Sequence, residues 1–162
     1  MIILGLDVSS SSTGWAVVKN GRFYKREDVD YGFIKGKLKV GPAEKLSSFK
    51  DRLRSLINDI EPDYIVVEDV FYGRSAKTFK VLSRYSGVTL DTCWDILNSE
   101  PIIVLPTAVR SVWGAQNKKE IFDIIVKKYE LDWTFKKYND ITDAIALAIY
   151  GHKYVRGKIN EK

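Results

Sequence analysis

The feature that most constrains this chain is an apolar strand at its start that ends in a carboxylate. Residues 2–6 read IILGL, a run typical of a buried strand, and Asp7 follows directly. A serine-rich turn and a second apolar run at residues 15–18 come next, which predicts a strand, a tight turn and a second strand. Because a buried carboxylate is costly without compensation, Asp7 requires a cation, a hydrogen-bond donor or a proton.

The composition excludes several classes of site. A chain of 162 residues is long enough for one domain with its own core. The single cysteine, Cys93, excludes an internal disulfide and a cysteine-rich zinc site, and the single histidine, His152, excludes a histidine metal cage. A resident metal is therefore expected to be a hard cation held by oxygen ligands. The net charge of +5 favours a polyanionic partner.

The location of the protein is predicted from what the sequence lacks. No apolar run reaches the length of a membrane span, and the N-terminus has neither a basic flank nor a cleavage site. We therefore expect a cytoplasmic protein that does not associate with membranes.

A second apolar strand also ends in acids, and the last predicted helix begins with two more. Residues 64–67 read YIVV, as in a strand buried on both faces, and Glu68 and Asp69 follow. The predicted helix over 140–152 is almost wholly apolar after its first turn, so it should pack in the core. Asp140 and Asp143 lie on one face of that first turn.

If the strand ends meet the last helix, four carboxylates converge: Asp7, Glu68, Asp140 and Asp143. They cannot all ionise side by side without compensation, and divalent cations provide it. The pattern predicts two Mg²⁺ ions per site, with Mn²⁺ able to substitute, as in enzymes that displace phosphoryl groups.

Each acid also has a purely structural explanation. Asp7 can accept hydrogen bonds from the serine turn, and Glu68 can be a strand end that meets solvent. Asp140 can cap the last helix, with Asp143 favoured by the helix dipole. The complete set, in order and on suitable elements, favours a site.

Basic residues gather just after Glu68. A helix is predicted over 73–98, and its expected core face is Ala76, Phe79, Leu82 and Tyr85. Its other side carries the basic stripe Arg74, Lys77, Lys80 and Arg84. A solvated face is the ordinary interpretation, and the position after Glu68 raises contact with a phosphate backbone as the alternative.

Four segments occur in an order that matches a known family. They are Gly5-Leu6-Asp7-Val8-Ser9 with Thr13-Gly14, then Glu68-Asp69-Val70-Phe71, then Pro106, Arg110, Val112, Gly114 and Lys118 or Lys119, and last Asp140-x-x-Asp143-Ala-x-Ala-x-Ala. Over residues 2–149 the chain resembles the RuvC family of Holliday junction resolvases. The resemblance implies the α/β ribonuclease H-like fold, a five-stranded mixed sheet flanked by helices, with a single nuclease domain over 1–152 and a polar tail over 153–162.

The resemblance also implies an activity and residue roles. Family members are Mg²⁺-dependent endonucleases that act as homodimers on four-way DNA junctions and leave 5′-phosphate and 3′-hydroxyl ends. Carried over, the four carboxylates would be the metal ligands and Phe71 would stack on a base at the junction centre. Arg110 and Lys118 or Lys119 would contact the scissile phosphate region. One departure is the turn Val8-Ser9-Ser10-Ser11-Ser12, where family members often have Pro-Gly. The short chain also looks like phage-encoded resolvases, which can be looser branched-DNA nucleases.

Three other functions are weighed against this one. The same carboxylates would serve an RNA-processing or RNA–DNA hybrid nuclease, and a branched-DNA-binding protein with weak or lost catalysis would share the fold. An aspartate before a Ser/Thr/Gly turn also opens the phosphate loop of actin-like and sugar-kinase ATPases, but 162 residues cannot hold the two domains that those need.

Overall fold

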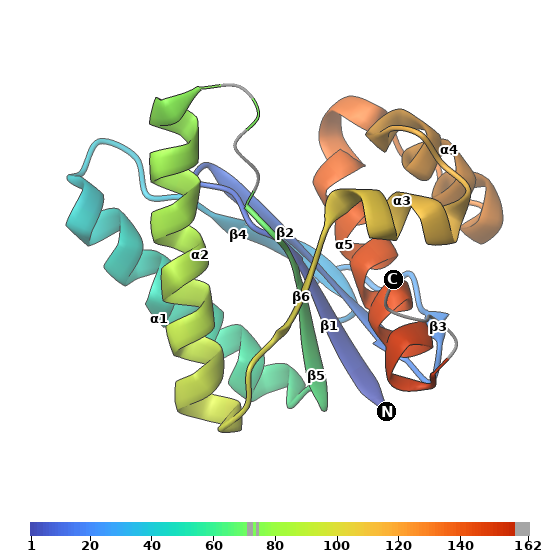
Figure 1. Ribbon diagram of the computed structural model, residues 1–162, viewed down its shortest axis with the longest axis horizontal. Coiled ribbons are helices and arrows are strands. Elements are labelled where there is room, and N and C mark those ends of the chain that lie inside the picture. The colour runs from blue at the N-terminus through green and yellow to red at the C-terminus, as the bar shows by residue number, and fades with distance from the viewer. Residues whose placement is uncertain (71–72, 74, 158–162) are drawn as a thin grey trace.

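One mixed sheet with helices on both faces organises the chain (Figure 1). The computed structural model describes residues 1–70, 73 and 75–157. The strands are β1 (Ile2–Asp7), β2 (Ser12–Lys19), β3 (Arg22–Phe23), β4 (Tyr31–Lys35), β5 (Tyr64–Glu68) and β6 (Ile102–Val104). The helices are α1 (Pro42–Ile60), α2 (Ala76–Leu97), α3 (Pro106–Trp113), α4 (Lys118–Tyr129) and α5 (Phe135–Val155).

The sheet order is β3-β2-β1-β5-β6, with β4 also paired to β2. β1 runs antiparallel to β2 and parallel to β5, so the mixed sheet expected from the sequence is confirmed. Five strands correspond to predicted ones. The sixth, β3, is a two-residue strand that follows the turn at Asn20 and Gly21, both of which have positive φ angles.

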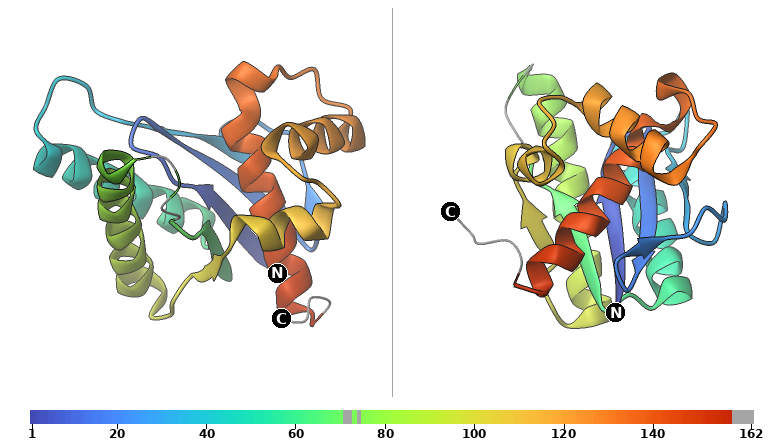
Figure 2. Two further views of the ribbon diagram at one scale, coloured as in Figure 1. Left: turned by 45° about the horizontal axis from the view of Figure 1, so that its top comes forward. Right: turned by 90° about the vertical axis from the view of Figure 1, so that its right-hand side faces the viewer.

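The two faces of the sheet build two separate cores. α1 and α2 cover one face, and α3, α4 and α5 cover the other (Figures 1 and 2). Within β1, Leu4 and Leu6 pack in the core with α1 and α2, whereas Ile3 packs in the core with α5. A strand that supplies both cores is apolar throughout, which explains the run at residues 2–6.

Helix α5 lies close to the sheet because glycine stands at the points of contact. A Cβ atom on Gly5 would come closer than 3.0 Å to the carbonyl oxygen of Ala144, and one on Gly14 would do the same at Asp140. The helix is buried from Ile141 to Gly151. Gly5 and Gly14 therefore determine how near the acids of α5 lie to the end of β1.

The predicted start of the last helix was wrong. α5 begins at Phe135, so Asp140 and Asp143 lie in its second and third turns rather than in its first. Asp140, the possible cap, lies inside the helix. The Asn139 side-chain amide, also inside it, donates to the carbonyl oxygen of Phe135 at 2.9 Å. Phe135 is anchored by an edge contact with Phe122, which stabilises the additional turn. α5 also continues to Val155, past the predicted end at residue 152.

The predicted core face of α2 was wrong at its beginning. Ala76 and Phe79 are exposed, and the buried face begins only at Tyr85. The reason is visible in Figure 1, where the first turns of α2 extend beyond the sheet. Within the described residues, no helix combines the length and the apolar character that a membrane crossing requires.

The close contact of α5 with β1 predicts an unequal response to two glycine substitutions. Gly5→Ala should lower the free energy of unfolding by about 1–3 kcal/mol or more, because the new methyl group meets backbone atoms. Gly87→Ala is the matched control, since nothing lies within 4 Å of its added Cβ, and it should raise stability by up to about 1 kcal/mol. Urea unfolding measures both, and a Gly5→Ala variant as stable as the wild type would contradict this packing.

Candidate active site

The ends of β1 and β5 bring Asp7 and Glu68 to the same edge of the sheet. The two strands are parallel neighbours, and Leu6 is in register with Val67, so the residues that follow lie side by side. Asp7 is the last residue of β1 and Glu68 the last of β5. The two strands that were expected to end in carboxylates therefore lie side by side, and their acids meet at one edge of the sheet.

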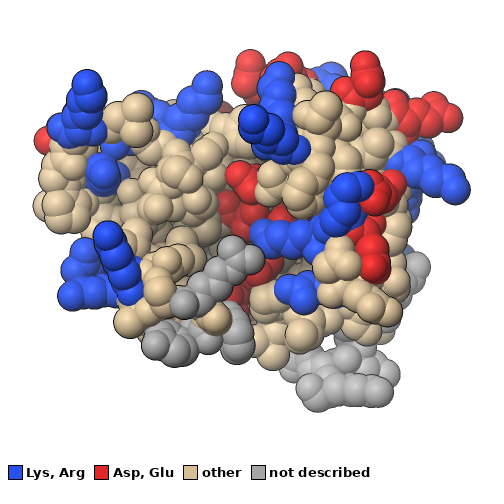
Figure 3. All heavy atoms as spheres, turned by 90° about the horizontal axis from the view of Figure 1, so that it is seen from above, with Lys and Arg blue, Asp and Glu red and all other residues tan. Residues whose placement is uncertain are grey.

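Helix α5 brings the other two acids to this edge. Asp140 and Asp143 are one turn apart, and the backbone of Asp140 rests on Gly14 of the neighbouring strand β2. Asp7, Glu68 and Asp140 line a cleft of about 420 Å³, and the carboxylate of Asp143 is buried with its side chain 5% exposed. Figure 3 shows carboxylates gathered in a hollow of this surface, with basic side chains around it.

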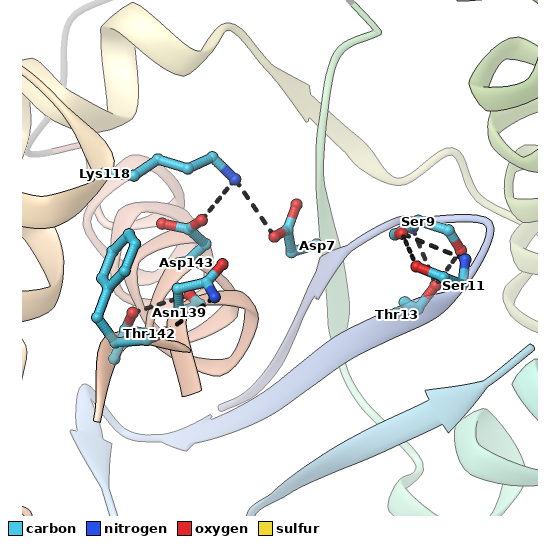
Figure 4. Close-up of polar contacts among 9 residues, drawn as sticks. Asp7, Ser9, Ser11, Thr13, Lys118, Asn139, Thr142 and Asp143 are labelled. Atoms are coloured by element: carbon cyan, nitrogen blue, oxygen red, sulfur yellow. Dashed lines mark hydrogen bonds and ion pairs between the residues drawn. The ribbon is translucent and has the colours of Figure 1, made fainter. Parts of the chain in front are cut away.

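Lys118 is the cation at the centre of this group. Its Nζ lies 2.6 Å from Asp143 Oδ2 and 3.5 Å from Asp7 Oδ2 (Figure 4). Lys118 is the first residue of α4, whose start is fixed by the Asn117 side chain accepting from the Glu120 backbone N–H at 3.0 Å. Within the described residues, the buried Asp143 Oδ2 has no partner other than this ammonium group.

One lysine does not compensate four acids, and the pKa values reflect this. Burial raises the pKa of Asp7 to about 8, Lys118 opposes the rise, and Asp143 and Glu68 add to it. Burial likewise raises the pKa values of Glu68, Asp140 and Asp143, again opposed by Lys118. Burial lowers the pKa of Lys118, but the facing carboxylates raise it above its ordinary value, so the ammonium stays charged.

This donor set fits a hard divalent cation in its chemistry. All four acidic side chains offer oxygen atoms, Asp143 is buried and the other three are half-buried, and together they carry more negative charge than Lys118 can neutralise. Among the described residues, no three acids are in ligating geometry as they stand, and the Lys118 ammonium lies between Asp7 and Asp143. A metal would therefore replace the ammonium as the compensating charge.

The structure distinguishes two lysines that the sequence left as alternatives. Lys118 points into the cleft, whereas Lys119 forms an ion pair with Asp123 and lies over the ring of Phe122. Arg110, on α3, lies near Glu68 and Asp143, and its positive charge opposes the rise in the pKa values of both carboxyl groups.

The predicted basic stripe is only partly described. Lys77, Lys80 and Arg84 are exposed on α2. Phe71 and Arg74 lie outside the described residues.

Sequence reasoning missed the hydroxyl groups that line the cleft opposite the acids. Thr78, Ser86 and Thr89 of α2 line it with Leu82 between them, and Ser10 contributes from the β1–β2 turn. The spacing of positions 78, 82, 86 and 89 is that of one helix face. That spacing was the available signal, but it is less conspicuous in the sequence than the basic stripe on another side of α2.

Comparisons with known proteins agree with this geometry. The family model described as "Crossover junction endodeoxyribonuclease RuvC" matches residues 3–152. A protein of that description from Alkaliphilus metalliredigens is 30% identical over 154 residues, which is 92% of this chain and 91% of that protein. One from Endomicrobium trichonymphae is 29% identical over 153 residues, 92% of this chain and 79% of that protein.

Solved structures share the fold at lower sequence identity. The structure of T. thermophilus RuvC in complex with Holliday junction substrate has a TM-score of 0.79 and 17% identity, and covers 98% of this chain and 97% of its own. The yeast mitochondrial Holliday junction resolvase has a TM-score of 0.62 and 11% identity, and covers 94% of this chain and 79% of its own. The fold class expected from the sequence is therefore confirmed.

The raised pKa of Asp7 predicts a pH-dependent gain of stability in Asp7→Asn. Because the folded-state pKa of about 8 exceeds the ordinary value of 3.8, the neutral carboxyl contributes stability that is present below pH 3.8 and lost as the pH rises through 8. In chelator at pH 9, Asp7→Asn should therefore melt at a higher temperature than the wild type, and 1 kcal/mol corresponds to about 2–4 °C at this chain length. At pH 4 the difference should be small.

Thermal unfolding followed by circular dichroism across this pH range measures the effect. Asp51→Asn is the matched control, because Asp51 is exposed on α1, and it should change stability by less than about 0.5 kcal/mol at any pH. An Asp7→Asn variant that is less stable than the wild type at pH 9 would show that Lys118 compensates the Asp7 charge fully.

Proposed function

Because this chain belongs to the RuvC family of crossover junction endodeoxyribonucleases, we propose that the four carboxylates at the sheet edge are its catalytic centre. The protein is a structure-selective endonuclease that resolves four-way DNA junctions. The observation that carries the assignment of the site is the meeting of Asp7, Glu68, Asp140 and Asp143 around a single compensating lysine.

The centre is proposed to hold two Mg²⁺ ions, with Mn²⁺ as a substitute, on the oxygens of these four side chains. When bound, such ions supply positive charge to the attacking and leaving oxygens of an in-line phosphoryl displacement. The crowded carboxylates support this proposal, because together they carry more negative charge than the single ammonium group of Lys118 can neutralise. Binding of a divalent ion would lower their pKa values and release protons.

The reaction is the hydrolysis of a phosphodiester. The oxygen of a water molecule bonds to phosphorus, the bond from phosphorus to the 3′ oxygen breaks, and the products are a 5′-phosphate and a 3′-hydroxyl. Asp7 and Asp143 would hold the metal in place of the Lys118 ammonium, and Lys118 would then be available to the scissile phosphate. Arg110, on α3, lies near enough to Glu68 and Asp143 for its permanent positive charge to act on both carboxylates.

The active unit is proposed to be a homodimer. Resolution of a junction requires paired cuts in two strands, and the described chain carries one catalytic edge. Two copies related by two-fold symmetry match a two-fold symmetric substrate. The bacterial origin of the similar proteins supports action in the cytoplasm of a bacterial cell or of a phage-infected host.

The proposal predicts that Asp143→Asn retains the fold and junction binding but loses detectable cleavage. The variant removes a metal-ligating charge while preserving the shape of the buried side chain. End-labelled four-way junction, replication fork, linear duplex and RNA–DNA hybrid are offered with Mg²⁺ or with chelator, and products are resolved on denaturing gels.

Paired symmetric nicks in the junction by the wild type, absent in chelator, are the expected result. Cutting of the hybrid alone would instead assign an RNA–DNA hybrid nuclease, and tight junction binding without any cutting would assign a branched-DNA-binding protein. An Asp143→Asn variant that cuts at the wild-type rate would remove Asp143 from the site.

The different directions of two adjacent lysines give a further prediction. Lys118→Gln should lower the single-turnover cleavage rate by about 10²–10³-fold, as expected when one charged stabiliser of the reacting phosphate is lost. Lys119→Gln removes the same charge one residue away, where the ammonium is paired with Asp123, and should change the rate by less than about three-fold. Equal rates for the two variants would contradict the proposed role of Lys118.

A further inference from the structure

The catalytic cleft continues into a groove that the acids do not line. Three adjoining cavities of about 420, 350 and 300 Å³ run from the catalytic edge, along α2, to the start of α1. Ser10, at the tip of the β1–β2 turn, lines all three. We call the two outer cavities the Ser10 groove.

The lining of the Ser10 groove combines cations, hydroxyls and apolar side chains. Lys77 and Thr78 line its middle part, and Lys45 and Arg84 line its far part. Val81 lines both parts. Within the described residues no carboxylate lines either outer cavity, in contrast to the catalytic cleft.

The cations of the groove are not neutralised by neighbouring acids. Lys45, Lys77 and Arg84 form no ion pair with any described residue. Farther along the same two helices, Lys50 Nζ lies 2.6 Å from Asp91 Oδ2 and an Arg54 nitrogen lies 2.9 Å from Asp95 Oδ2. The pair α1–α2 therefore neutralises its cations away from the catalytic edge and leaves them available near it.

The serine turn is held in place by hydrogen bonds of its backbone, which leave the Ser10 hydroxyl available. Ser9 N–H donates to Thr13 Oγ1 at 3.1 Å, and Gly36 N–H donates to the carbonyl oxygen of Ser11 at 2.8 Å. The Tyr85 hydroxyl donates to the carbonyl oxygen of Ser10 at 3.4 Å. The Ser10 hydroxyl itself has no hydrogen-bond partner among the described residues, so a ligand in the groove can take it.

We propose that the Ser10 groove binds an unpaired stretch of the DNA strand that enters the catalytic cleft. This rests on the proposed function, because the groove matters only if the cleft cuts DNA. Phosphates contact the cations and the Ser10 hydroxyl, and sugars and bases lie against the apolar side chains between them. Sites for single-stranded nucleic acid combine such a positive track with surfaces for bases, whereas a duplex presents only phosphates and groove edges.

The first test compares two double variants of equal charge change. Lys45→Gln/Arg84→Gln should weaken binding of a labelled oligothymidylate about ten-fold in chelator, and should lower the slope of log affinity against log salt by about 1.4, or 0.7 for each lost phosphate contact. Lys127→Gln/Lys136→Gln is the matched control, since both lysines are exposed on α4 and α5, and it should change affinity by less than about two-fold.

The second test places a charge in the groove. Ser10→Glu should weaken oligothymidylate binding about ten-fold by repelling phosphate, whereas Ser55→Glu, at an exposed position of α1, should leave it within about two-fold. Thermal unfolding of each variant confirms that the fold is retained. A duplex of equal length is measured alongside, and its affinity should fall much less than that of the single strand.

The outcomes separate this inference from the proposed function. A wild-type protein that neither binds nor cuts the four-way junction would overturn the function itself. A wild-type protein that cuts the junction, with groove variants that match their controls, would overturn only the groove. Equal losses for duplex and single strand would also overturn it, since they would show a general attraction between charges.

Discussion

The structure depends on the close approach of α5 to β1 and β2, which glycine permits at Gly5 and Gly14. A helix held away by side chains would leave Asp140 and Asp143 too far from the ends of the strands to share a site with Asp7 and Glu68. The same approach buries the helix between Ile141 and Gly151, so the apolar contacts that stabilise the fold also hold the acids in place. The packing of α5 against the sheet therefore also determines where the charges of Asp140 and Asp143 lie.

This packing brings the buried Asp143 and the half-buried Asp7, Glu68 and Asp140 together at one cleft, where their charges are only partly exposed to solvent. The raised pKa of Asp7 expresses the free energy stored there, and Lys118 relieves only part of it. The rest of the protein compensates through two apolar cores on opposite faces of one sheet. The repulsion between carboxylates at this edge of the sheet destabilises the fold, and a ligand of positive charge would relieve it. Substitution of one of these acids should therefore stabilise the fold, and on the proposed function it should also remove activity.

The sequence predicted the strands and their acidic ends, which follow from local patterns. It did not predict the start of α5 or the directions of the two lysines, because tertiary contacts determine both. Asp7 and Glu68 were recognisable because an apolar strand that ends in an acid needs an explanation. The start of α5 was missed because Asp140 can cap a helix, while the contact of Phe135 with Phe122 is not visible in the sequence. The directions of Lys118 and Lys119 depend on how α4 packs, so their order along the chain left both open.

The β1–β2 hairpin connects the acidic cleft with the groove that is proposed to bind the DNA strand. Asp7 ends one strand of the hairpin, and Gly14 on the other strand contacts the backbone of Asp140. The turn that carries Ser9 and Ser11 joins the two strands (Figure 4). Since the turn is hydrogen-bonded to Gly36 and Tyr85, a DNA strand bound at Ser10, as proposed, would lie at a constant distance from Asp7. A change in this turn would therefore alter which branched substrates are positioned for cutting, while the carboxylates and their chemistry stay the same.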